Sequence, residues 1–348
     1  MPRKISSPHY AHLSVESFLK QSASWKGSVL GALCFSADAS ASGVLAGMDV
    51  PCLCVPMSRL DAGDSICEIW HGNGSPTQGR CGAIHYRHDD GVLFGVIELP
   101  ETGFAASADK TPLQQATESA YGQVFALLDT LRFPHLFRCW NYIADINAHS
   151  FGLERYRQFN QGRQDAFLAH GRDVLGNVPA ACALGVSQGP LRIAFLAGRV
   201  APLCIENPRQ ISAGEYPAQY GLRSPTFSRA SLARLGQDEV LLVSGTASIV
   251  GHASRHPADV VAQTRETMTN IGAVLAEANR LSRRPDFALS SLNYRVYVRH
   301  AADQAQIHAE LTHCVGDSLK VVYLQADVCR QDLLLEIEAT AAHALEPG

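Results

Sequence analysis

The sequence predicts an α+β protein with two tandem modules, each a mixed β-sheet with two helices packed on one face. Short apolar runs typical of strands alternate with longer segments in which apolar residues recur at helical spacing. The order helix–strand–helix–strand–strand occurs twice, over 111–197 and over 257–340. With 348 residues, 46% of them hydrophobic, the chain is long enough for two cores.

The N-terminal part is predicted to be rich in strands. Residues 1–28 look like an irregular lead-in, and Asp, Gly, Asn and Ser separate the apolar runs that follow. The Gly-rich segment 71–82 is expected to be a loop, and it lacks the Walker Lys-Ser/Thr of a phosphate-binding loop. Strands are expected at 28–35, 52–56, 66–70, 83–87 and 92–99.

The two copies of the repeat account for the rest of the chain. The first is expected to have helices 111–131 and 153–170 with strands 136–146, 180–186 and 191–197. The second is expected to have a leading strand 239–249, helices 257–281 and 303–314, and strands 287–298, 319–325 and 332–340. A repeat of this length indicates a duplicated domain rather than a solenoid. We expect a first module over 1–200 and a second over 201–348, with 201–238 as a linking segment that lines the site.

Composition excludes several classes of function. A net charge of -4 gives no basic surface for nucleic acid. The ten cysteines lack zinc spacing, which favours free thiols in a reducing cytosol. The N-terminus lacks the apolar region of a signal peptide, and no apolar run is long enough for a membrane span, so a cytoplasmic location is expected. His252 and His256 lie four residues apart, but Pro257 follows and no carboxylate joins them at ligand spacing, so no metal is expected.

The last predicted strand carries an unusual carboxylate. Leu333, Leu335 and Ile337 share one face of this strand, and Glu336 points to the other face within an apolar run. Its side chain is either exposed on an open sheet face or held in a pocket. In a pocket, burial would favour the neutral form and prepare the group to donate a proton.

Two sets of motifs resemble known families. The helix residues 262–264, 270–271 and 274–275, the strand 294–298 and the closing Leu335-Glu336-Ile337-Glu338-Ala339 are similar to the RidA/YjgF family. The whole chain resembles the chorismatases, most closely the hydroxybenzoate-forming members of pigment pathways, such as the bifunctional 3-/4-hydroxybenzoate synthase type. The segments that carry this likeness are 154–163, 206–210, 216–230, 244–252 and Cys329. The resemblance implies two tandem RidA/YjgF-like (chorismate-mutase-like) modules.

The resemblance also implies a reaction. Chorismate would be the substrate, and pyruvate and hydroxybenzoate the products: 3-hydroxybenzoate, alone or with 4-hydroxybenzoate, without a cofactor. Glu336 would protonate the enolpyruvyl group, and Cys329 would shape the cavity or act chemically. Gly245 would let the substrate ring approach the backbone closely.

Arginines are the expected ligands of the two substrate carboxylates, because a guanidinium fork matches a carboxylate. Arg163 lies seven residues after Tyr156, two helical turns away, so the two share a face. Tyr216, Arg223 and Arg229 lie in the linking segment. A cleft between the two modules would bring these residues to Glu336.

Three alternatives stay open at this point. A hydrolytic chorismatase would yield 3,4-dihydroxycyclohexadienoate instead of an aromatic product. A RidA-like imine deaminase would need an arginine from strand 287–298 or near Glu336, where Arg295 and Arg330 are available. A non-catalytic binder of a small aromatic acid would hold chorismate without releasing pyruvate. The sequence allows either a monomer or a homotrimer.

Overall fold

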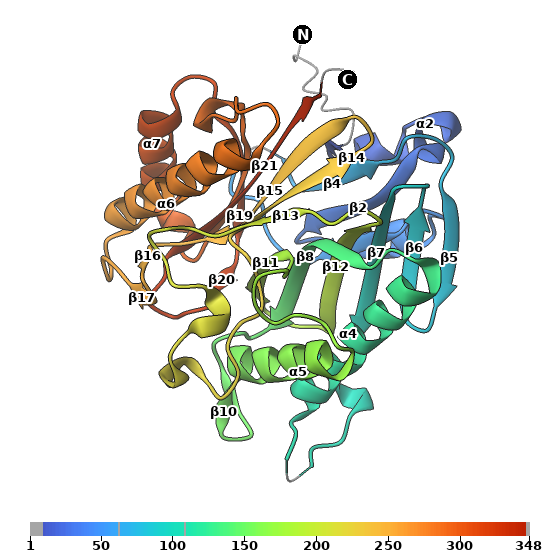
Figure 1. Cartoon of the computed structure of the whole chain (residues 1–348), viewed down its shortest axis with the longest axis horizontal. Coiled ribbons are helices and arrows are strands. Elements are labelled where there is room, and N and C mark those ends of the chain that lie inside the picture. Colours follow the sequence, from blue (N-terminus) through green and yellow to red (C-terminus); the bar gives the residue numbers. More distant parts are fainter. Residues whose placement is uncertain (1–9, 62, 108, 346–348) are drawn as a thin grey trace.

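The computed structural model describes residues 10–61, 63–107 and 109–345. In this part of the chain the long strands form three sheets (Figure 1). Their strand orders are β1-β4-β2-β3, β20-β11-β8-β12-β7-β6-β5 and β13-β14-β15-β21-β18-β19. The predicted α+β class is confirmed.

The first sheet is formed by the segment predicted as an irregular lead-in followed by hairpin-linked strands. The strands predicted at 28–35, 52–56 and 66–70 are confirmed, but the first two pair in parallel and are not a hairpin. Ser14 and Ser22 cap two helices of five residues each, which are too short to show a helical period. The prediction of irregular structure is therefore wrong for residues 10–28, and residues 1–9 lie outside the described part. The elements are β1 (Tyr10–Leu13), α1 (Val15–Leu19), α2 (Ala23–Gly27), β2 (Val29–Ser36), α3 (Ala39–Ala46), β3 (Cys52–Val55) and β4 (Ser65–His71).

The second sheet contains the first copy of the predicted repeat. Its helix α4 begins as expected, with Thr111 as the cap and Pro112 in the first turn. The loop predicted over 71–82 is wrong in part, because 77–81 is an exposed, polar edge strand without an apolar signal. The elements are β5 (Thr77–Cys81), β6 (Ile84–His88), β7 (Val92–Leu99), α4 (Pro112–Leu131), β8 (His135–Ala144), α5 (Arg155–Ala169), β11 (Ala180–Val186), β12 (Leu191–Gly198) and, from near the C-terminus, β20 (Asp327–Val328).

The third sheet contains the second copy. Asp259 caps α6, so the helix begins at Val260 rather than at the predicted residue 257. The strand predicted from residue 287 begins only at Asn293, because a short 3-10 helix precedes it. The elements are β13 (Leu203–Ile205), β14 (Ala230–Leu235), β15 (Asp238–Thr246), α6 (Val260–Leu281), β18 (Asn293–Val298), α7 (Gln304–Val315), β19 (Lys320–Gln325) and β21 (Leu335–Ala344). Two small hairpins complete the fold: β9 (His149–Ser150) with β10 (Leu153–Glu154), and β16 (Ile249–Val250) with β17 (Ala253–Ser254).

The three sheets share one arrangement of four strands. The sets β1-β4-β2-β3, β7-β12-β8-β11 and β15-β21-β18-β19 each contain two antiparallel pairs followed by one parallel pair. In each set a helix connects the two parallel strands: α3, α5 and α7. The predicted duplication is thus present, and the first sheet is a shorter third copy that the sequence analysis missed. The boundary at residues 200 and 201 stays a prediction.

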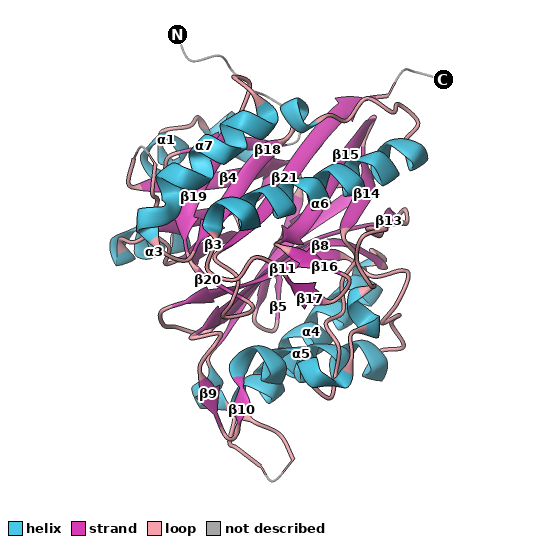
Figure 2. Ribbon diagram, turned by 90° about the vertical axis from the view of Figure 1, so that its left-hand side faces the viewer, coloured by secondary structure: helices cyan, strands magenta, loops and turns pink. Residues whose placement is uncertain are grey.

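A common core lies between the three sheets, and the helices lie outside. Figure 2 shows α6 and α7 across one face of the third sheet, and α4 and α5 together below the second sheet. The inner faces contribute large side chains to one cluster: Phe35, Trp70, Phe94, Trp140, Tyr142, Tyr297 and Leu324. Each outer face is covered by its own helices, which pack against it in separate clusters.

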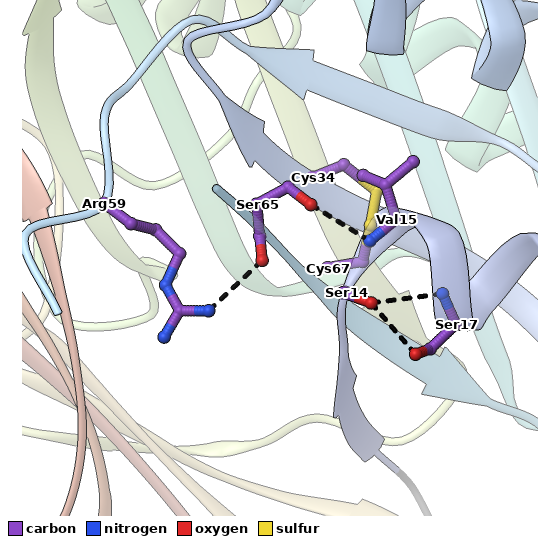
Figure 3. The surroundings of a disulfide bond; sticks show 7 residues. All are labelled: Ser14, Val15, Ser17, Cys34, Arg59, Ser65 and Cys67. Atoms are coloured by element: carbon purple, nitrogen blue, oxygen red, sulfur yellow. Dashed lines mark hydrogen bonds between the residues drawn. A yellow bond between two sulfur atoms is a disulfide. The ribbon is translucent and has the colours of Figure 1, made fainter. Parts of the chain in front are cut away.

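A disulfide joins two strands of the first sheet (Figure 3). Cys34 on β2 and Cys67 on β4 are direct partners in the antiparallel register, although 33 residues separate them in sequence. The prediction that all cysteines are free thiols is wrong for this pair. Their spacing in sequence carried no signal, because only the pairing of the strands brings the two side chains together.

Candidate active site

A cavity of about 520 Å³ lies at the junction of the second and third sheets. A smaller chamber of about 40 Å³ continues inward between α5, β11 and β21. The two spaces share six lining residues: Tyr156, Pro225, Phe227, Gly245, Cys329 and Glu336. The predicted cleft between the two modules is therefore present.

Glu336 forms part of the wall of both spaces. It lies on β21 opposite Tyr297 of β18, and only 4% of its surface is exposed. Burial raises the pKa of its carboxyl to about 8, the nearby Glu338 adds to the rise, and Arg138 opposes it. Of the two environments that the sequence left open, the structure thus selects the pocket, and the group is protonated at neutral pH.

Gly245 makes room for this carboxyl group. It lies near the end of β15, where the pairing with β21 is irregular between Val243 and Thr246. A Cβ atom at this position would come within 1.8 Å of Glu336 Oε1 and 3.2 Å of Cys182 Cβ. The sequence analysis expected the glycine to admit the substrate ring, whereas the structure gives it a nearer neighbour, the acid itself.

For the reaction that the sequence resemblance implies, we expect Gly245→Ala to reduce kcat by about 10²-fold or more, because the added methyl group must displace the carboxyl of Glu336. Steady-state kinetics with chorismate measure this loss. Gly272→Ala is the matched control: it lies in α6, and an added Cβ there has no heavy atom within 4 Å. Equal rates for Gly245→Ala and wild type would show that the carboxyl need not occupy this position.

Arg163 and Tyr156 project from α5 into the inner chamber, as their spacing predicted. Arg163 is 3% exposed, and its Nε and Nη2 atoms have no hydrogen-bond partner among the described residues. Its guanidinium lies over the rings of Tyr121 and Phe167, at 5.0 and 5.5 Å from their centroids. A buried guanidinium with free donors is costly to keep and is ready to bind an anion.

Arg229 and Tyr216 line the outer cavity together. Arg229 Nη2 donates to the Ile211 carbonyl at 2.7 Å and to Tyr216 Oη at 3.0 Å. Its Nε atom has no hydrogen-bond partner in the described chain, and the carboxylate of Glu206 is 3.9 Å away. Arg229 therefore offers a second, positioned guanidinium to a ligand.

Arg223 does not join this group. Its side chain is partly exposed and pairs with Asp165 at 3.1 Å, and it is absent from the lining of either space. Seven of the eight residues predicted for the site are thus brought together. Arg223 lies in the same Tyr-rich segment as Arg229, but the chain turns it towards α5 and solvent.

Arg330 lines the cavity, although the sequence analysis considered it only for the deaminase alternative. Its guanidinium lies 4.2 Å from the ring centroid of Tyr220 and 5.3 Å from that of Tyr216, and it donates to the His252 carbonyl at 2.9 Å. Its position directly after Cys329 was the available signal. Arg157 also lines the outer cavity, paired with Glu154 at 3.2 Å.

The thiol of Cys329 lies beside Glu336. Burial raises its pKa to about 12, and the Glu336 carboxyl adds to the rise. A thiol held neutral in this way is a poor nucleophile, which favours a role in shaping the cavity. Cys182 faces the same chamber from β11, and burial raises its pKa well above the usual value.

The remaining predictions concern metals, membranes and partners. His256 pairs with Glu266 at 3.3 Å and His252 with Tyr220 at 3.1 Å, and the described residues contain no group of three or more potential metal ligands. Within the same part of the chain, none of the helices is long and apolar enough to cross a membrane. The cytoplasmic location, the lack of nucleic-acid binding and the choice between monomer and homotrimer stay predictions.

Comparison with known proteins identifies the family. The profile of the family described as "Chorismatase FkbO/Hyg5-like, N-terminal" matches residues 68–197. A chorismatase of Streptomyces rapamycinicus is 36% identical over 286 residues, which are 80% of this chain and 83% of that protein. A 3-hydroxybenzoate synthase of Streptomyces hygroscopicus is 36% identical over 284 residues, 79% of this chain and 81% of the relative.

A solved structure extends the match to nearly the whole chain. The crystal structure of a chorismatase covers 96% of this chain and 98% of its own, with a TM-score of 0.82 and 28% sequence identity. The likeness thus includes both sheets that form the cavity. The chain belongs to the chorismatase family.

Proposed function

We propose that this protein converts chorismate to pyruvate and hydroxybenzoate, with Glu336 as the general acid. The observation that carries the proposal is that a neutral acid and two cationic side chains line one connected cavity. A carboxyl group that burial keeps protonated lies in the same pocket as the guanidiniums of Arg163 and Arg229. A substrate with two carboxylates and an acid-labile enol ether suits this combination.

In the proposed reaction Glu336 donates its proton to the methylene carbon of the enolpyruvyl group. The bond between the ring carbon and the ether oxygen then breaks, and that oxygen leaves as the ketone oxygen of pyruvate. The neighbouring ring hydroxyl attacks the electron-poor carbon and releases its own proton, which restores the acid. The resulting arene oxide opens to the aromatic product, so that hydroxybenzoate and pyruvate together contain all the atoms of chorismate.

Two observations support hydroxybenzoate as the product. A relative with 36% identity is named 3-hydroxybenzoate synthase. Cys329 occupies space beside the acid, where a hydrolytic enzyme has to admit a water molecule. Of the two arginines named for the deaminase alternative, Arg295 is buried against Glu338 and Glu68 and does not line the cavity. Arg330 does line it, so the product assay described below has to separate the two reactions.

Incubation with chorismate tests the proposal directly. We expect equimolar pyruvate and hydroxybenzoate, identified by chromatography and by a coupled pyruvate assay. Formation of 3,4-dihydroxycyclohexadienoate would show the hydrolytic reaction instead. Ammonia release from 2-iminobutyrate, or chorismate binding without pyruvate release, would contradict the proposal.

The pH dependence follows from the state of Glu336. Because the acid must be protonated to act, kcat/KM should be constant below its pKa of about 8 and should fall about tenfold per pH unit above it. Rates measured from about pH 6 to about pH 10 with chorismate test this expectation. A rate that rises through pH 8 would assign Glu336 the role of a base.

A further inference from the structure

A buried ionic cluster lies behind Glu336, where the three sheets meet. Glu338 pairs with Arg138 of β8 at 3.0 Å and with Arg295 of β18 at 2.7 Å. Arg295 also approaches Glu68 of the first sheet, at 3.6 Å. All four side chains are almost completely buried. Each sheet therefore contributes at least one charge to a site from which water is excluded.

Neutral donors complete the cluster. The indole of Trp70 donates to Glu68 at 3.0 Å, and the indole of Trp140 donates to Glu338 at 3.2 Å. Tyr297 donates to Glu338 at 3.3 Å, and burial raises the pKa of this tyrosine well above its usual value. The fixed charges are thus two carboxylates and two guanidiniums, which balance.

Glu336 lies two residues before Glu338 on the same face of β21. If Glu336 lost its proton, the cluster would hold three carboxylates against the two guanidiniums of Arg138 and Arg295, a costly state in a buried site. Arg163 lines the same chamber from α5, but among the described residues it forms no ion pair with Glu336. The pKa values agree with this arrangement: Arg295 and then His12 outweigh burial and lower that of Glu68 to about 2, whereas that of Glu336 rises. Glu68 is therefore ionised at every pH at which Glu336 titrates.

Several elements contribute titratable or charged groups to the surroundings of Glu336 and Glu68. Glu336 faces Glu338 on its own strand, Arg138 from β8, Tyr297 from β18 and Gly245 from β15. From β11, α5 and the segment after β20 it faces three neutral groups: Cys182, Tyr156 and Cys329. The guanidinium of Arg163 lines the same inner chamber, and those of Arg229 and Arg330 line the outer cavity. Glu68 faces Arg295 and the ring of His12, the latter at 3.4 Å, and the phenol of Tyr10 is also near.

We propose that Glu68 is a positioning residue for the reaction: its carboxylate balances Arg295, so that the shared core is neutral only while Glu336 keeps its proton. Glu68 does not line the cavity and reaches the acid only through Arg295 and Glu338. This inference rests on the proposed function, in which Glu336 is the proton donor. It gives a residue of the first sheet, which does not line the cavity, an effect on the protonation of Glu336.

Glu68→Gln tests the proposal, because it removes one negative charge and keeps the shape of the side chain. The excess positive charge should then favour ionised Glu336, and its pKa should fall by about one unit. Titration by carbon NMR in protein labelled with 13C-glutamate measures this pKa, and Glu336→Gln identifies the signal. The alkaline limb of kcat/KM should move down by the same amount.

Two further variants show whether a change in the pKa of Glu336 comes from the lost charge or from damage to the fold. Glu68→Gln with Arg295→Met removes both members of the pair and should restore the wild-type pKa. Glu239→Gln removes a different buried carboxylate of the third sheet, which binds Ser282 and His343, and should leave the pKa of Glu336 unchanged.

The outcomes decide the proposal separately from the function. An unchanged pKa of Glu336 in folded Glu68→Gln overturns the charge balance. If that variant does not fold, a shift above about half a unit in the double variant also overturns it. If the pKa shifts as expected while no variant or wild type releases pyruvate, the charge balance stands and the proposed function fails.

Discussion

Glu336→Gln should abolish turnover while substrate binding persists. The amide has the shape of the protonated acid but cannot donate a proton to carbon, and a positioned general acid is worth about 10²–10⁴ in rate. Because Arg163 and Arg229 are untouched, chorismate should still bind. Single-turnover kinetics and calorimetric titration with chorismate measure the two effects separately. A variant that keeps a rate near that of wild type would remove Glu336 from the chemistry.

Although Glu336→Gln should abolish activity, it should increase the stability of the folded protein at alkaline pH. The pKa of Glu336 is about 8 in the folded protein, above the ordinary 4.5, so folded wild type binds the proton more tightly than the unfolded chain. Its contribution is fully present below about pH 4.5 and is lost as pH rises to about 8. Glutamine cannot ionise, so the variant should be more stable than wild type above pH 8, by on the order of 1.4 kcal/mol per unit of pKa shift.

Thermal unfolding at about pH 6 and about pH 9 tests this expectation. We expect the difference in Tm between Glu336→Gln and wild type to grow with pH. Glu239→Gln is the control, since it removes a buried carboxylate that pairs with His343 away from the cavity. An identical pH dependence of Tm in Glu336→Gln and wild type would show that the carboxyl is not held protonated.

Arg163→Met should raise KM for chorismate by about 10- to 100-fold, because charge-assisted hydrogen bonds to one substrate carboxylate are lost. Methionine fills much of the same space against Tyr121 and Phe167. Stability without substrate should not fall, since the free guanidinium has unpartnered buried donors. Kinetics and thermal unfolding give both quantities.

Arg223→Met is the matched control for the effect of Arg163→Met on KM. Its guanidinium pairs with Asp165 at the surface and not with the cavity, so KM should change by less than about twofold. Equal rises in KM for the two variants would mean that Arg163 acts through the fold and not through contact with substrate.

The site was predictable where chemistry leaves a local mark in the sequence. Glu336 stands out because apolar neighbours flank it on a strand, and Arg163 because it lies two helical turns from Tyr156. The role of Gly245 was not predictable, since the contact with the acid depends on the register of β15 and β21. The link between Glu68 and Arg295 depends on the first and third sheets meeting, which no short-range pattern encodes.

The fold shows the same division. Apart from the start of β18, the long helices and apolar strands of the repeat were predicted to within a few residues, because their periods extend over many positions. In the first sheet the strands β2, β3 and β4 were predicted, whereas β1 and the helices were missed because β1 has only four residues and the helices are short. The disulfide of that sheet was missed for a related reason: its cysteines meet only through strand pairing.

Because the three related sheets belong to one polypeptide, a substitution can change the contact between two sheets without changing the other contacts. In an assembly of identical subunits, every substitution would appear at all junctions at once. Each sheet contributes an aromatic residue to the shared core: Phe35, Tyr142 and Tyr297. The register partners of these residues on the neighbouring antiparallel strand differ, and are Ile66, Arg192 and Glu336 in that order. An aliphatic group, a permanent cation and the proposed proton donor thus occupy corresponding places, so that a substitution at one junction leaves the other two unchanged.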